Sequence, residues 1–145
     1  PADEKTPTSQ SAYLRAVCLA RDPNKTKISC GYCFSSESIS SAIGCKSLGH
    51  YADPMLKSGV TDSREYLKVI LNKLNQKNLK INNVSISIEA LRPRLDNCTD
   101  KIISSLSKIL NIEKENIGIT YTSGEGMSAF GQGKGMQCFA VVSIA

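Results

Sequence analysis

Apolar residues recur at the spacing of β-strands in five stretches of the chain. These stretches are residues 12–20, 26–34, 84–90, 117–121 and 136–144. The clearest is the third, where Val84, Ile86 and Ile88 alternate with serines, because successive side chains of a strand point to opposite faces. The first two stretches are joined by the turn-forming sequence RDPNK, which predicts a hairpin.

Helical spacing of apolar residues marks three further stretches. They are residues 35–48, a longer stretch that follows Asp62, and residues 99–110. Asp62 and Glu65 match a capping box, in which two side chains satisfy free N–H groups in the first turn of a helix. Residues 49–61, between the first two predicted helices, are predicted to be a loop.

The resulting order is ββααβαββ, which predicts an α+β domain with a mostly antiparallel sheet. Three helices cannot cover both faces of a sheet of about five strands, so we expect helices on one face only. The other face would expose a large apolar patch, and we expect other copies of the chain to cover it. Residues 1–11 are polar and contain two prolines, which indicates a flexible arm before a single domain of residues 12–145.

Composition narrows the class of protein. A chain of 145 residues with 41% hydrophobic residues is one globular domain, and its apolar runs are too short to span a bilayer. The net charge of +5 arises with lysines spread along the whole sequence, so we expect no nucleic-acid partner. The chain begins at Pro1 instead of a methionine, so we expect an intracellular or organellar protein (plastid-type or mitochondrial) from which an upstream segment was removed.

Four motifs occur in order between residues 48 and 145. They are DPMLKSGVTDSREYL from Asp53, VSISIEALRPRL from Val84, TSGE from Thr122 and GQGKG from Gly131. Their order and intervals resemble the 2-C-methyl-D-erythritol 2,4-cyclodiphosphate synthase family, trimeric CMP-releasing lyases of the non-mevalonate isoprenoid pathway. The resemblance implies the family's fold, a homotrimer or an assembly of related subunits, and active sites between neighbouring subunits.

The resemblance also implies a site for a nucleotide diphosphate at the second and third motifs. Its residues would be Ala90, Pro93, Arg94, Leu95, Thr122, Ser123 and Glu125. Ala90 and the turn to Leu95 would shape a cytosine pocket, and Arg94 would lie beside the diphosphate. In the family the two segments meet across a subunit boundary, and weak binding of CDP or CMP is our expectation. An ordinary strand-to-helix turn with a solvated surface arginine explains the same residues equally well.

The metal-binding histidines of that family are missing from this sequence. In the family one Asp and two His hold zinc, and the Glu that Glu125 matches helps to hold a second divalent metal. Asp22 is a remnant of the first site, but Asn24 takes the place of a histidine, and His50 is the one histidine of the chain. Amides and hydroxyls are poor zinc ligands, so we expect no zinc there, while Mg²⁺ at Glu125 remains open.

A different, structural zinc site is suggested by the spacing of Cys30, Cys33, Cys45 and His50. Residues three apart in one extended strand point to opposite faces, which argues against such a site unless Gly31 forms a bulge. Core cysteines and a single satisfied histidine are the simpler interpretation. A redox pair of the first two cysteines is disfavoured, because activated CxxC thiolates usually stand at the start of a helix.

Two functions are therefore open. The chain is either a non-catalytic pseudoenzyme, a trimeric scaffold or assembly subunit with residual nucleotide binding, or an active synthase with an altered metal site. The missing histidines favour the first. The glycine-rich stretch of residues 123–135 could cradle a phosphate with backbone N–H groups, but it lacks the spacing of a P-loop.

Overall fold

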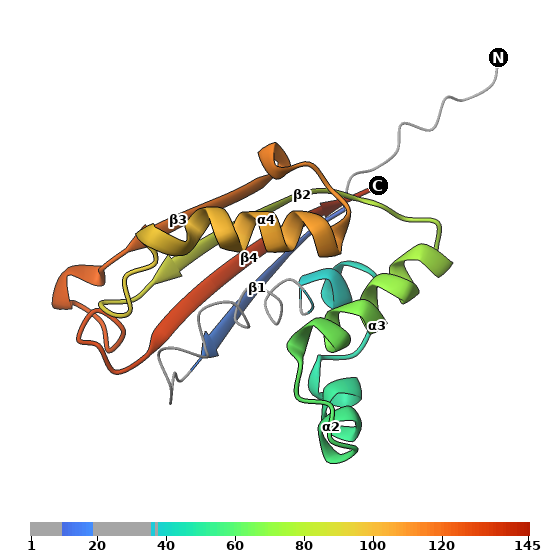
Figure 1. Cartoon of the computed structure of the whole chain (residues 1–145), viewed down its shortest axis with the longest axis horizontal. Helices are drawn as coiled ribbons and strands as arrows, with labels where there is room; N and C mark the ends of the chain where they lie inside the picture. The colour runs from blue at the N-terminus through green and yellow to red at the C-terminus, as the bar shows by residue number, and fades with distance from the viewer. Residues whose placement is uncertain (1–9, 19–35, 37) are drawn as a thin grey trace.

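The computed structural model of the chain describes residues 10–18, 36 and 38–145 (Figure 1). These residues form a four-stranded sheet of order β1-β4-β2-β3. The strands are β1 (Gln10–Cys18), β2 (Ile81–Glu89), β3 (Ile117–Thr122) and β4 (Met136–Ile144). β4 pairs antiparallel with β1 and with β2, whereas β2 and β3 run parallel. The α+β class and the mostly antiparallel sheet are thus confirmed.

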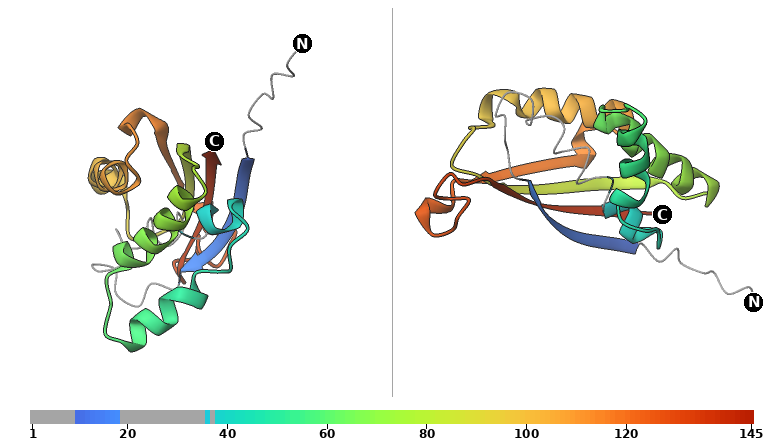
Figure 2. Two further views of the ribbon diagram at one scale, coloured as in Figure 1. Left: turned by 90° about the vertical axis from the view of Figure 1, so that its right-hand side faces the viewer. Right: turned by 90° about the horizontal axis from the view of Figure 1, so that it is seen from below.

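The helices lie on one face of this sheet, as predicted. They are α2 (Gly49–Lys57), α3 (Ser63–Gln76) and α4 (Thr99–Leu110), preceded by a short helical stretch at residues 38–42. Both views of Figure 2 place α3 and α4 on the same side of the sheet, and α4 connects the parallel strands β2 and β3. Within the described ranges no helix is long and apolar enough to cross a membrane.

Two predicted boundaries differ from those in the structure, and one predicted element cannot be compared with it. β1 begins at Gln10, two residues inside the predicted arm, and the first predicted helix ends at residue 42. Gly44 follows in a left-handed conformation, with φ of +69°, which glycine adopts without steric cost. The strand predicted at residues 26–34, with its hairpin, lies outside the described residues.

The hydrophobic core lies between the sheet and the helices. Val84, Ile86 and Ile88 of β2 face it as the alternation predicts, with exposed fractions of 1%, 1% and 9%. The largest fully buried side chains are Ile39, Leu67, Ile70, Ile86, Leu106, Met136 and Ile144. They come from both layers, so burial of these side chains holds the helices against the sheet.

On β2 and β3 the opposite face of the sheet is polar, while β4 places Phe139 and Val141 there, so the side chains described on these three strands do not form the large apolar patch that was predicted. Ser85, Ser87 and Thr120 are exposed there, and the hydroxyls of Ser87 and Thr120 are hydrogen-bonded at 3.0 Å across β2 and β3. Phe139 of β4, which pairs with Ser87, is a large apolar side chain with 44% of its surface exposed. β2 and β3 therefore alternate between an apolar face and a hydroxyl-rich face.

Helix α3 begins at its predicted cap. The Asp62 carboxylate accepts a hydrogen bond from the backbone N–H of Arg64 at 2.9 Å. The Glu65 carboxylate accepts instead from Lys68 at 2.7 Å, so only the first half of the predicted capping box forms. Hydrogen bonds from the Arg64 side chain and backbone hold the pKa of the Asp62 carboxyl below its ordinary value.

The loop predicted at residues 49–61 is wrong, because its first nine residues form α2. Pro54 lies inside this helix, although proline lacks the N–H group that an interior position normally donates. Ala52 is the one buried residue of α2. A helix with so little apolar surface leaves no periodic stripe in the sequence, which is why the pattern did not reveal it.

Candidate nucleotide site

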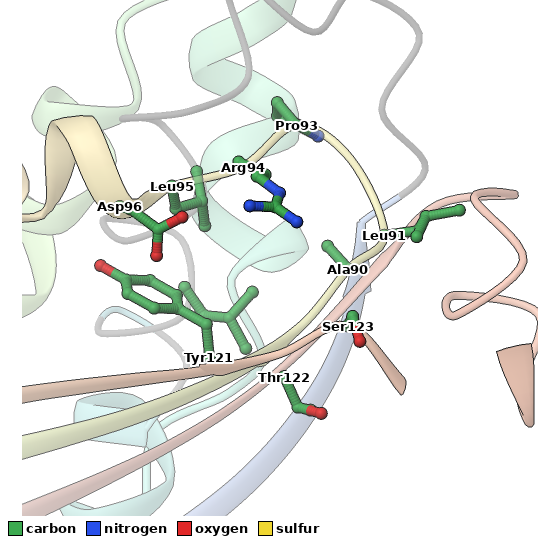
Figure 3. A pocket seen from close by; sticks show the side chains of 10 residues that line it. Ala90, Leu91, Pro93, Arg94, Leu95, Asp96, Tyr121, Thr122 and Ser123 are labelled. Atoms are coloured by element: carbon green, nitrogen blue, oxygen red, sulfur yellow. The ribbon is translucent and has the colours of Figure 1, made fainter. Parts of the chain in front are cut away.

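A pocket of about 280 Å³ opens where β2 and β3 end, beside the 3-10 helix Asp96–Cys98 that leads into α4 (Figure 3). Because β2 and β3 are parallel, their carboxyl ends meet at one edge of the sheet, where ligands of such sheets commonly bind. The N–H of Ala90 donates to the carbonyl of Thr122 at 3.0 Å. This bond joins the two segments that form the pocket.

Six of the seven residues predicted for the nucleotide diphosphate site line this pocket. They are Ala90, Pro93, Arg94, Leu95, Thr122 and Ser123. All six belong to one chain, so the prediction that the two segments meet across a subunit boundary is wrong for them. Glu125 does not line the pocket; it is exposed in the 3-10 helix Gly124–Gly126, with φ of +46°.

The guanidinium of Arg94 supplies positive charge to the pocket. In Figure 3 it points inward from the turn between Pro93 and Leu95. Arg94 takes part in neither of the salt bridges found in the described ranges, so no carboxylate in those ranges pairs with its guanidinium. A planar guanidinium can donate two parallel hydrogen bonds to a phosphate, which makes Arg94 the natural anchor for an anion.

The hydroxyls of Thr122 and Ser123 are held by the turn that follows them. Gly124 N–H donates to Thr122 Oγ1 at 3.1 Å, and Glu125 N–H donates to Ser123 Oγ at 3.4 Å. Each oxygen accepts one bond, which leaves its hydroxyl proton available to a ligand. Neighbouring residues of a strand point to opposite sides, and Figure 3 shows the Thr122 side chain on the far side of the ribbon from Tyr121. Ser123 is therefore the better placed of the two.

Tyr121 and Asp96 also line the pocket, and the sequence did not single them out. Tyr121 is half-buried, and its hydroxyl is hydrogen-bonded to that of Thr99, the first residue of α4. Burial raises the pKa of Tyr121, and the negative charges of Asp96 and Asp100 add to this, while the bond to Thr99 opposes it. The phenol therefore stays neutral near pH 7. The strand alternation, which puts Tyr121 on the helix-covered face, was the available signal.

The glycine-rich loop of residues 123–135 is folded on itself and does not present a phosphate cradle. Six of its N–H groups donate to acceptors within the loop, namely those of Glu125, Met127, Gly131, Gln132, Gly133 and Lys134. A backbone N–H that already has an acceptor is not available to bind an anion. The loop instead packs against the end of β2.

Glu89, the last residue of β2, anchors this loop. Its carboxylate accepts hydrogen bonds from the Ser128 hydroxyl and from the Gln137 side-chain amide, the latter at 3.2 Å. The backbone of Gly124, at φ of +69°, passes so close that a Cβ there would collide with Glu89 Oε1. Only glycine fits this position without displacing the carboxylate.

The donors that the structure describes do not fit the zinc ion implied by the resemblance. In residues 10–18, 36 and 38–145, no group of three or more His, Cys, Asp or Glu side chains could hold a metal ion. Cys45, Cys98 and Cys138 form no disulfide bond, and the ring of His50 packs edge-on against Tyr51 with centroids 6.4 Å apart. The other predicted candidates, Asp22, Asn24, Cys30 and Cys33, lie outside the described residues.

Known proteins resemble this chain in sequence. The model of the YgbB family matches residues 35–145. The 2-C-methyl-D-erythritol 2,4-cyclodiphosphate synthase of Chlamydia caviae is 41% identical over 99 residues, which cover 68% of this chain and 56% of that protein. The synthase of Chlamydia muridarum is 40% identical over 98 residues, covering 67% and 54%. The chain thus spans about half the length of the curated relatives that it matches.

Solved structures resemble the chain in fold. IspF of Plasmodium falciparum, a CDP complex, superposes with a TM-score of 0.74 at 20% identity over 94% of both chains. The bifunctional IspDF of Campylobacter jejuni has a TM-score of 0.74 at 17% identity over 94% of this chain and 41% of its own. At such low identity these likenesses establish a shared fold.

Proposed function

Because the chain belongs to the YgbB family and resembles two 2-C-methyl-D-erythritol 2,4-cyclodiphosphate synthases in sequence, we propose that it binds a cytidine nucleotide without turning it over. In this proposal it acts as a non-catalytic, trimeric scaffold or assembly subunit. The observation that carries the nucleotide site is that six of the seven predicted residues line one pocket. The CDP bound in the Plasmodium falciparum structure supports the ligand class.

In the proposed complex the diphosphate binds at Arg94 and the Ser123 hydroxyl. Arg94 supplies a bidentate donor, and Ser123 supplies one further hydrogen bond. Arg94 is exposed, so water and salt weaken its attraction for phosphate. We therefore expect a dissociation constant of about 0.1–1 mM, equivalent to roughly 4–5.5 kcal/mol. If Glu125 serves as a ligand for Mg²⁺, addition of Mg²⁺ strengthens this binding.

We propose that the chain does not turn over its ligand because it lacks the histidines that hold zinc in the family. Asn24 stands where the family has a histidine, and His50, which packs on Tyr51, is the one histidine of the chain. Zinc in such a site would stabilise the charge that develops on the transferring phosphate, typically by several kcal/mol. Without that contribution we expect CMP release at or near background.

An active synthase with an altered metal site is the second candidate. It is favoured by identities of 40–41% to curated synthases over about two-thirds of this chain. Metal analysis of the purified protein, together with an assay of CMP release from the cytidyl substrate, separates the two candidates. One zinc per chain and turnover of about 1 per second or more would establish the synthase and refute the non-catalytic proposal.

Calorimetric titration with CDP tests the nucleotide site. We expect saturable binding, weakened about tenfold or more by Arg94→Ala because the main cationic anchor is lost. Arg92→Ala is the matched control, since Arg92 belongs to the same turn but lies against Gly133 and does not line the pocket. Absence of saturation at several millimolar CDP, with and without Mg²⁺, would exclude the nucleotide site and leave the scaffold.

Trimer formation is the remaining part of the proposal. The hydroxyl-rich face of the sheet lacks covering helices in the described part of the chain, and Phe139 is exposed on it. An apolar side chain amid polar groups is typical of a protein interface. Light scattering at micromolar concentration should give the mass of a trimer, and a stable monomer would exclude it.

A further inference from the structure

A second pocket lies at the opposite end of β2 from the first. Its volume is about 390 Å³, and it opens between the last turns of α3 and α4 and the start of β2. Figure 1 shows these three segments on the same side of the molecule. β2 runs from Ile81 to Glu89, so roughly 25 Å of strand separates this pocket from the one that Arg94 lines. The two pockets are therefore distinct sites.

The walls of the second pocket are aliphatic. Six such side chains line it, namely Leu71, Leu74, Ile81, Ile109, Leu110 and Ile112. Leu74, Ile81 and Leu110 belong to the core and are 2%, 8% and 5% exposed, whereas the other three pack against the core but stay partly exposed. An apolar ligand that covers this surface removes it from water, which is favourable. No aromatic ring is among the described residues of the wall, so an alkyl chain suits it better than a planar base.

The polar residues of this pocket carry one positive charge. Asn75, Lys80 and Asn111 line it and are exposed. Lys80 is the one charged residue among the described residues that line the pocket, and neither ion pair of the described ranges includes it. Its ammonium group attracts an anion, and the two amides can donate further hydrogen bonds. The polar part of the pocket thus favours a negatively charged head group.

The backbone around the pocket is fixed by hydrogen bonds. Lys80 and Ala145 exchange two backbone bonds, of 2.6 and 2.9 Å. The N–H of Ile112 donates to the carbonyl of Ser107 at 3.3 Å, and the Ser107 hydroxyl donates to the carbonyl of Ile112 at 2.7 Å. Because these segments are already ordered, a ligand loses little affinity to ordering them.

The ends of α3 and α4 act against an anion. Their last carbonyl groups carry partial negative charge, which repels anions and attracts cations. α3 ends at Lys77, an exposed lysine that offsets this charge, and Lys80 stands on the strand and not on a helix. The anionic head group is therefore expected beside Lys80, and the alkyl chain between the two helices.

We propose that this pocket binds a small amphiphile, an alkyl chain with a carboxylate or phosphate head group. The chain lies on the six aliphatic side chains, and the head group pairs with Lys80. No residue of the nucleotide pocket takes part, so this site is independent of the proposed function.

Calorimetric titrations of the full chain with octanoate, hexanoate and octyl phosphate test the proposal. Octanoate should bind about tenfold more tightly than hexanoate, because two more methylene groups are buried. Octyl phosphate shows whether a phosphate head group is accepted as well as a carboxylate. Octyltrimethylammonium has a similar chain and the opposite charge, so equal binding of this cation would overturn the assignment of the head group.

Variants locate the ligand in the pocket. Lys80→Gln should weaken octanoate about twofold to fivefold, a modest effect because the lysine is exposed. Lys77→Gln is the matched control, since it removes an exposed lysine that does not line the pocket. Ile109→Gln should weaken octanoate about fivefold or more by making the wall polar, with thermal denaturation to verify that the variant is folded.

The result that would overturn the proposal is also specific. Octanoate that does not saturate, or that binds Lys80→Gln and Lys77→Gln equally well, would exclude this site. CDP and octanoate should bind independently, and competition between them would place octanoate in the nucleotide pocket instead. If the chain sediments with phosphatidylglycerol vesicles but does not bind octanoate, this face is a membrane surface and the proposal fails. Each of these outcomes leaves the test of CDP binding unaffected.

Discussion

On the covered face of the sheet, β2 presents Ile86 with 1% of its surface exposed, while its neighbour Ser87 is exposed on the other face. The covered face is held by apolar burial. The open face is ordered by polar pairs, Ser87 with Thr120 and Gln137 with Glu89. The difference shows that the open face is not an uncovered core. A partner that covers it must offer donors and acceptors to its hydroxyls and amides, since burying these groups unpaired costs free energy.

Substitution of adjacent residues on the two faces should give the largest contrast. Ile86→Ala leaves a cavity in the core and should lower the free energy of unfolding by about 2–5 kcal/mol. Ser87→Ala removes one exposed hydroxyl and should change it by about 0.5 kcal/mol or less. Urea denaturation measures both. Similar losses for the two variants would mean that the open face carries packing comparable to that of the core.

A substitution of Gly124 examines the contact between the glycine-rich loop and Glu89, at the edge of the open face. Gly124→Ala should cost about 1–2 kcal/mol for left-handed backbone and about as much again because Glu89 must move and release Ser128. Gly126→Ala is the control, since it has φ of +77° but open space around a new Cβ, so only the first cost applies. If thermal denaturation shows the same loss of stability for Gly124→Ala and Gly126→Ala, the contact with Glu89 does not contribute to stability.

Phe139→Asp should break the open face as an interface while sparing the fold. Phe139 is 44% exposed, so a charge there should change the free energy of unfolding by about 1 kcal/mol or less, yet a charge buried between subunits is strongly unfavourable. Light scattering should then report a monomer. Leu56→Asp, on the exposed surface of α2, should leave the assembly intact. An unchanged mass for Phe139→Asp would place the interface elsewhere.

Substitution of Asp62, the cap of α3 on the covered face, should have the smallest effect on stability. Asp62→Ala should destabilise the fold by about 0.5–1 kcal/mol, and Asp62→Asn, which keeps a capping oxygen, by less. The pKa of Asp62 is lowered in the folded state, so its stabilisation is complete above its unfolded pKa of about 3.9 and is lost as pH falls through the lower folded value. Acid titration of Asp62→Ala should therefore show a shallower loss of stability than wild type over that window.

Much of the fold could be predicted where apolar side chains repeat. The bounds of α4 and β4 agree with the predicted stretches of residues 99–110 and 136–144, because one face of each element is buried and its period appears in the sequence. α2 has no such face, so it could not be recognised. The pairing of β1 with β4 joins distant parts of the chain, which no local pattern specifies.

The candidate site was predicted in part for a similar reason. Arg94 and Ser123 stand in recognisable motifs, and the parallel pairing of β2 with β3 brings those motifs together. Tyr121 was assigned to the strand by alternation alone, and nothing in that pattern shows that the end of a strand borders a pocket. Glu125 matches a motif, yet its positive φ turns the chain and leaves it outside the pocket.

The central position of β4 constrains the order in which the protein can fold as it is synthesised. β4 pairs with β1 on one side and β2 on the other, and it follows both of them in the sequence, so it leaves the ribosome after them. The β2–α4–β3 unit is local and can form first, whereas β1 pairs only with β4 among the described strands. Until β4 has been synthesised, the edges of β1 and β2 that it will cover are open, and in this interval chaperones would protect the growing chain from aggregation.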